Sequence, residues 1–173
     1  MIHRLTGVAL AMTALALGLA ARPAPTHAAS IAPNAFKWPP WLSVEWPVNP
    51  YDQANRDALL LLHAAKHDGV PTTRDLAGTA EGMVNGTRRS VALHFDATSE
   101  PGVFALRRQW PASGAWLLRI TLGNSTTALV ALDKNGAVTS VDVPMQVGSG
   151  APFPRPVGPR EIDSALAVLA SRP

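Results

Sequence analysis

The chain has 173 residues, of which 47% are hydrophobic, with 15 Lys and Arg against 12 Asp and Glu and no cysteine. The lack of cysteine excludes disulfides, thiolate metal sites and cysteine nucleophiles. The charges are nearly balanced, whereas a nucleic-acid binder concentrates Lys and Arg on one face, so we expect no nucleic-acid partner.

Residues 1–29 have the layout of a secretory signal peptide. A basic start at Arg4 precedes an apolar run over residues 5–21 and a small-residue stretch that ends at Ala29. We expect cleavage and export to the periplasm or the extracellular space. The alternative is a retained membrane anchor, which needs about 17–25 apolar residues, and this run is at the short end. Removal of the leader leaves 13 basic and 12 acidic residues, and no later segment that could span a bilayer.

Residues 30–41 form a Trp/Pro-rich N-terminal arm, and residues 42–144 are expected to fold as strands. The stretch "RSVALHFD" from Arg89 alternates apolar and polar residues, as a strand with one buried face does. Just upstream, Asn85-Gly86 suits a two-residue type I′ turn, because both turn positions need a positive φ. The resulting hairpin places Ala80 opposite Val91.

A second hairpin is predicted at Asn135-Gly136, where the same logic places Val130 opposite Val141. Further strands are expected over residues 42–48 and 59–64, and two more within residues 102–122. The run "ALLLLHAAKHDGVP" predicts a central strand that is covered on both faces at least in part and that turns at Asp68-Gly69. About seven or eight short strands predict an all-β antiparallel sandwich.

The stretch "GVFALRRQWPASGAWLLRITL" allows two connections between its two strands. A hairpin that paired Trp110 with Trp116 would set Arg107 opposite Arg119, and like charges paired across strands are destabilising. We therefore predict that the chain crosses from one sheet to the other here, as in a Greek key, with both tryptophans plugging the end of the core.

The C-terminal part departs from this pattern. Residues 145–158 are rich in Pro and Gly and are predicted to be a linker without regular structure. A short helix is expected over residues 159–171, because Pro159 suits a first turn, Glu161 favours its positive end, and one stripe carries apolar residues, namely Ile162, Leu166 and Leu169.

The order "HDGVP", hairpin, "PGVFAL" and "WPASGAWLLRI" resembles the Ig-like sandwich modules of bacterial exported proteins, of the carboxypeptidase-regulatory-like, transthyretin-like and YtkA-like kinds. The resemblance covers about residues 42–123, and Phe104 stands where such modules often have tyrosine. It implies an Ig-like Greek-key sandwich that serves as an accessory or binding module without catalysis. It carries no functional residues across, because the matching positions are structural.

Three histidines remain after loss of the leader, namely His63, His67 and His94. His63 and His67 are four residues apart, which on one strand places them on the same face. With Asp68, Asp96 or Met83 nearby, they are candidate ligands for an open copper or zinc site. The alternative is that His63 ends a strand and His67 lies in a solvated turn, with no cofactor bound.

The arm sequence "WPPWLSVEWP" contains Trp38, Trp41 and Trp46. Such aromatic faces bind sugars, proline-rich peptides or a partner protein, because they give a large contact area at low entropic cost. The alternative is a rigid arm in which Trp41 or Trp46 covers the core.

Other candidate sites are weaker. Arg88, Arg89, Arg107, Arg108 and Arg119 form either a basic patch or scattered solvated side chains. Ser149 lacks a nucleophile-elbow motif, and Glu81 and Asp96 are the only strand carboxylates near a histidine. We therefore expect no enzyme. The sequence favours an exported, non-catalytic interaction module with a protein partner, and the alternative is a periplasmic copper- or zinc-binding protein that uses His63, His67 and His94.

Overall fold

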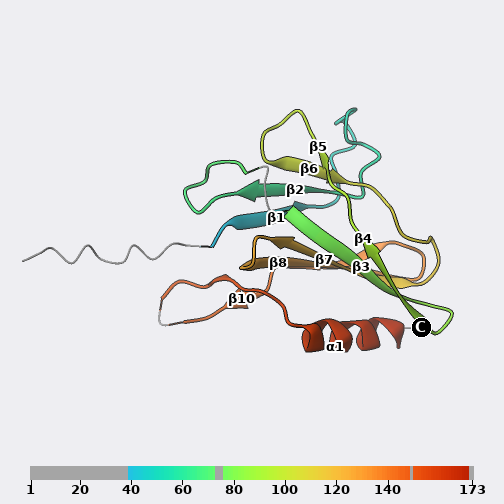
Figure 1. Cartoon of the computed structure of the whole chain (residues 1–173). Coiled ribbons are helices and arrows are strands. Elements are labelled where there is room, and N and C mark those ends of the chain that lie inside the picture. Colours follow the sequence, from blue (N-terminus) through green and yellow to red (C-terminus); the bar gives the residue numbers. More distant parts are fainter. Residues whose placement is uncertain (1–38, 73–75, 149, 172–173) are drawn as a thin grey trace, which may run out of the picture. The chain divides into compact units, whose positions relative to one another are not determined.

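The structure is a computed structural model that describes residues 39–72, 76–148 and 150–171. The expected signal peptide and most of the N-terminal arm lie outside these residues. Within them the chain is an all-β sandwich with one C-terminal helix (Figure 1). No described helix is long and apolar enough to cross a membrane.

Two antiparallel sheets supply the layers. The first has the order β1-β2-β6-β5, with the bounds β1 Trp41–Glu45, β2 Leu60–Ala65, β6 Val103–Leu106 and β5 Asp96–Ala97. The second has the order β4-β3-β7-β8-β9, with the bounds β4 Thr87–Ala92, β3 Leu76–Val84, β7 Ala115–Leu122, β8 Thr126–Leu132 and β9 Val138–Asp142. A separate short pair joins β10, Met145–Gln146, to β11, Phe153–Pro154.

Both predicted hairpins form in the predicted register. Ala80 pairs with Val91 around a turn in which Asn85 and Gly86 have φ values of 49° and 72°. Val130 pairs with Val141, but in this second turn only Gly136 has a positive φ, and the register shifts between Ala131 and Leu132.

Two expected strands end earlier than the alternation suggests. The stretch "RSVALHFD" does not run as one strand: β4 ends at Ala92 and the chain crosses to the other sheet, where Asp96 begins β5.

The first strand begins at Trp41 and ends at Glu45, just before the Trp46–Pro47 segment, since proline has no N–H to donate to a ladder. Trp41, the last residue of the predicted arm, is therefore also the first residue of the first sheet.

The predicted crossing between sheets is confirmed. β6 lies in the first sheet and β7 in the second, so Arg107 and Arg119 are not paired across a hairpin. Trp110 and Trp116 are both buried, and their ring centroids lie 6.4 Å apart. The two indoles thus pack against each other inside the sandwich.

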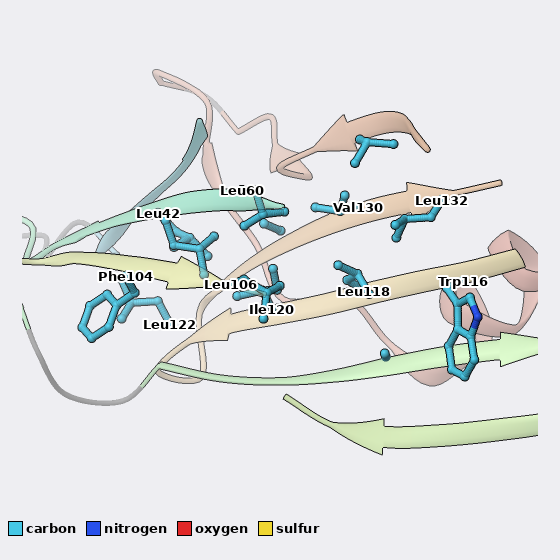
Figure 2. Packing of buried hydrophobic residues seen from close by; sticks show 14 of the residues in the cluster. Leu42, Leu60, Phe104, Leu106, Trp116, Leu118, Ile120, Leu122, Val130 and Leu132 are labelled. Carbon is cyan, nitrogen blue, oxygen red and sulfur yellow. The ribbon is translucent and has the colours of Figure 1, made fainter. Parts of the chain in front are cut away.

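The core lies between the inner faces of the two sheets (Figure 2). Leu60 and Leu62 of β2 are fully buried in it together with Leu118 and Ile120 of β7. Leu61 points to the opposite face of β2, where the loop that carries Val48 and Ala58 covers it. β2 is therefore a central strand whose inner face is buried and whose outer face is covered in part, as its continuous apolar run predicted.

The expectation that residues 145–158 lack regular structure is wrong. β10 and β11 pair with each other, and the Arg155 N–H donates to the Pro144 carbonyl at 2.9 Å. Val157 is buried beneath the helix. Proline has no backbone N–H to donate. It is therefore tolerated in a two-stranded pair at a position whose N–H side faces away from the partner strand.

The C-terminal helix, α1, spans Pro159–Ala170 and packs on the outer face of the second sheet. Its predicted stripe, Ile162, Leu166 and Leu169, is buried against Leu117 and Ala131. The Glu161 carboxylate accepts a hydrogen bond from the Gly158 N–H at 3.1 Å and two from Arg155. The helix start is thus fixed by its own first turn and by the residues just before it.

Gly82 on β3 pairs with Trp116 on β7, and a Cβ at this position would overlap the indole ring. We predict that Gly82→Ala lowers the free energy of unfolding by about 1–3 kcal/mol through overpacking. Gly150→Ala is the control, because a Cβ there meets nothing within 4 Å. Urea denaturation checks both variants, and equal midpoints would contradict the packing described here.

Acidification should weaken the start of α1. The Arg155 guanidinium and the Gly158 N–H lower the pKa of Glu161 to about 2. Because the pKa is lower in the folded state, the ionised carboxylate stabilises the fold at pH values above the ordinary pKa of 4.5. This stabilisation is lost as the pH falls from 4.5 through the folded-state pKa of about 2. We expect an NMR titration to show the low pKa, and Glu161→Gln to remove the corresponding pH dependence of stability between about 4.5 and about 2.

Candidate functional site

The arm tryptophans do not cover the core. Trp38 lies outside the described residues, whereas Trp41 is 55% exposed and Trp46 is 46% exposed. The expectation that Trp41 or Trp46 closes the core is therefore wrong. Leu42 is the side chain of β1 that enters the core, and Trp41 points to the opposite face of the strand. Tyr51, in the loop that follows, is 87% exposed.

The outer face of β1 places polar side chains beside Trp41. Ser43 and Glu45 point to the same side of the strand, because side chains alternate along it. Across the ladder Trp41 pairs with Ala65, whose small side chain covers little of an indole, and Ser43 pairs with His63. The His63 Nε2 and Glu45 Oε2 atoms are 3.1 Å apart. This face therefore combines an open indole with a histidine–carboxylate pair.

The structure does not bring the three candidate histidines into one cluster. β2 ends at Ala65, so His67 lies in the turn that follows, and the strand period cannot place it beside His63. His94 lies 3.8 Å from Asp96. Across the described ranges, no group of three or more His, Asp or Glu side chains could hold a metal ion. Copper or zinc binding by His63, His67 and His94 stays a prediction from the sequence.

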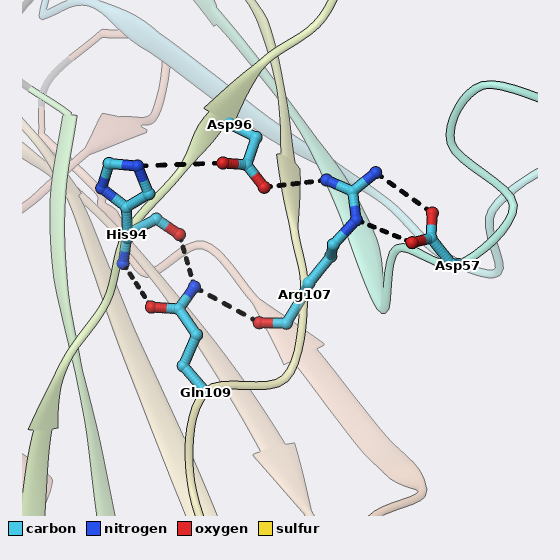
Figure 3. Close-up of polar contacts among 5 residues, drawn as sticks. All are labelled: Asp57, His94, Asp96, Arg107 and Gln109. Carbon is cyan, nitrogen blue, oxygen red and sulfur yellow. Dashed lines mark hydrogen bonds and ion pairs between the residues drawn. The ribbon is translucent and has the colours of Figure 1, made fainter.

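Arg107 is the centre of a polar network at the surface (Figure 3). Its Nε and Nη2 atoms donate to the two Asp57 carboxylate oxygens at 2.9 and 3.1 Å, and its Nη1 atom donates to Asp96 Oδ2 at 2.8 Å. The hydrogen bond from Arg107 lowers the pKa of Asp57, and the two carboxylates raise the pKa of Arg107. Asp57 was absent from the sequence candidates, because it is 50 residues from Arg107 along the chain.

Gln109 joins the same region to the segment between β4 and β5. Its Oε1 accepts from the His94 N–H at 2.7 Å, and its Nε2 donates to the His94 carbonyl at 2.6 Å (Figure 3). The Gln109 amide thus pairs with the His94 N–H and carbonyl as the backbone of a neighbouring strand would. Arg107 and Gln109, which follow β6, thus connect their own segment to the loop that carries Asp57 and to the segment of residues 94–96. These contacts hold the fold together.

Three of the other candidate charges, Arg88, Arg108 and Glu81, are also engaged. Arg88 pairs with Glu81 and Asp163, and Arg108 donates to the Gly136 carbonyl. Glu81 also accepts from the Ser90 hydroxyl at 2.8 Å. Three of the five candidate arginines, Arg88, Arg107 and Arg108, thus have acidic or carbonyl partners of their own. Ser149 lies outside the described residues.

No protein-family model, curated protein or solved structure matches this chain.

The Gln109 contacts generate a stability prediction. We expect Gln109→Ala to lower the free energy of unfolding by about 1 kcal/mol, since two hydrogen bonds to the His94 backbone are lost. Gln53→Ala is the control, because the side chain of Gln53 contacts one described partner, Arg56, from which it accepts a hydrogen bond three residues along the chain. Urea denaturation measures the free energy of unfolding of both variants. An equal decrease in the two would show that the Gln109 hydrogen bonds to His94 do not stabilise the fold.

Proposed function

We propose that this chain is an exported, non-catalytic interaction module that binds a protein partner through the segment of residues 41–51. We call Trp41, Trp46 and Tyr51 in this segment the arm surface. The exposure of Trp41 and Trp46 carries the proposal, because the other described tryptophans, Trp110 and Trp116, are buried in the core.

Exposed tryptophans suit protein recognition on energetic grounds. An indole adds a large apolar area with few rotatable bonds, and tryptophan is enriched among the residues that dominate binding energies. Trp41 also has polar neighbours on the same face of β1, namely Ser43 and Glu45, which can form hydrogen bonds at the rim of a contact.

The strand order supports an Ig-like Greek-key topology as part of this proposal. An Ig domain places strands A, B, E and D in one sheet and C, F and G in the other. The order β1-β2-β6-β5 corresponds to A-B-E-D, and β3-β7-β8 corresponds to C-F-G, with β4 and β9 as additional edge strands. Modules with this architecture serve many functions, so the site and not the fold carries the binding proposal.

Export is the second part of the proposal, and the leader-like residues 1–29 support it. We expect N-terminal sequencing of the protein from the exported fraction of the cells that produce it to begin near Ser30. An intact Met1 in a membrane fraction would favour the anchored form instead.

Site-specific photocrosslinking tests the arm surface. A photoreactive amino acid in place of Trp46 should yield a discrete covalent adduct with one protein in the exported fraction. The same amino acid in place of Val70, which is equally exposed in the turn after β2, should not. Once the partner is identified by mass spectrometry, Trp41→Ser in the purified protein should weaken its binding about tenfold or more. The same adduct from both positions, or none from Trp46, would contradict the proposal.

A further inference from the structure

The two sheets have four edges, and three of them are protected against pairing with another chain. β5 has only two residues, and β4 carries Arg88 and Arg89. Beside β1, the Thr126 hydroxyl donates to the Pro40 carbonyl at 2.6 Å, which ties that edge to the second sheet. Short strands, charged side chains and covering contacts are the usual protections of sheet edges.

β9 is longer than β5, and its one charged side chain is Asp142. Its sequence, "VTSVD", contains no basic residue, and β8 is its partner in the sheet on one side only. Val141 points to the core side of the sheet, opposite Val130, yet is 37% exposed. A strand that paired with β9 would cover this side chain as well as satisfy the open backbone groups.

A groove of about 320 Å³ lies beside β9 on the outer face of the sheet, between β8, β9 and α1. Its apolar lining includes Leu129, Ala165 and Val168, of which Val168 is 54% exposed. Ser140 lines the groove on the β9 side, and its small side chain leaves room for a larger one to reach across from a neighbouring strand. The free edge and the apolar groove are therefore adjacent.

The charge of the groove identifies the kind of segment that fits. Asp142 is the one charged residue in its described lining, and the Asp142 carboxylate makes no hydrogen bond or ion pair with a described residue. Arg155 interacts with it only through space, because its guanidinium is held by both Glu161 oxygens. A second copy of β9 would bring no basic residue to Asp142, whereas a foreign strand with Lys or Arg would.

We propose that β9 and this groove bind an extended segment of a partner protein by strand addition. In this segment, a large apolar side chain enters the groove over Ser140, and a basic side chain on the same face meets Asp142. Strand addition derives affinity from the backbone and specificity from alternate side chains. This site is separate from the arm surface and rests on different observations.

The probe is a library of capped heptapeptides in which alternate positions hold Leu, Phe or Lys and the others hold Val or Thr. We expect saturable binding to the full-length protein, with slowed amide exchange in β9. The matched library with Glu in place of Lys should bind about tenfold more weakly. Peptides with N-methylated alternate amides should not bind, because they cannot extend a sheet.

Three variants locate the site. Asp142→Lys and Val168→Lys, both at exposed positions, should each weaken binding about tenfold, whereas Val70→Lys places the same charge on a distant turn and should not. Trp41→Ser should leave peptide binding unchanged, so failure of the arm surface and failure of this site can be told apart. The proposal would be overturned by no saturable binding to the folded protein, by equal binding of the N-methylated peptides, or by a dimer that Val141→Lys dissociates.

Discussion

The contact between Gly82 and Trp116, on neighbouring strands of the second sheet, lets a large indole pack into one end of the core. Gly82 has no side chain, so the indole of Trp116 lies directly over the backbone of β3 and is completely buried. Trp110, from the segment that crosses between the sheets, packs against the same indole. The two indoles fill this end of the core, and the neighbouring leucines and valines fill the rest of it.

This arrangement separates the aromatic residues into two groups with different consequences. The indoles of β7 and of the crossing segment stabilise the core, whereas those near β1 face solvent. The polar clusters divide in a similar way: Arg107 and Gln109 hold chain segments together, and Asp142 remains without a direct partner among the described residues. Groups that are already engaged contribute to stability, so the unengaged groups are the better candidates for binding.

Local sequence rules predicted much of this fold and little of its surface. Asn85-Gly86 and the alternation around it determined a hairpin register, and like charges at Arg107 and Arg119 indicated the crossing. The same alternation could not reveal that Asp96 leaves the second sheet, because a period of two continues across a change of sheet. Asp57, Arg107 and Asp96 meet through tertiary structure alone. The exposure of Trp41 was not predicted either, because the sequence did not show which face of β1 the core covers.

The helix α1 has an apolar cluster of its own, separate from the core between the sheets. Its attachment rests on one stripe of side chains and on ion pairs at the surface, such as Arg88 with Asp163. Such an appended element opens with a smaller free energy than the domain that carries it. We therefore expect the C-terminal segment to open before the sandwich unfolds, which would uncover Leu117 and Ala131.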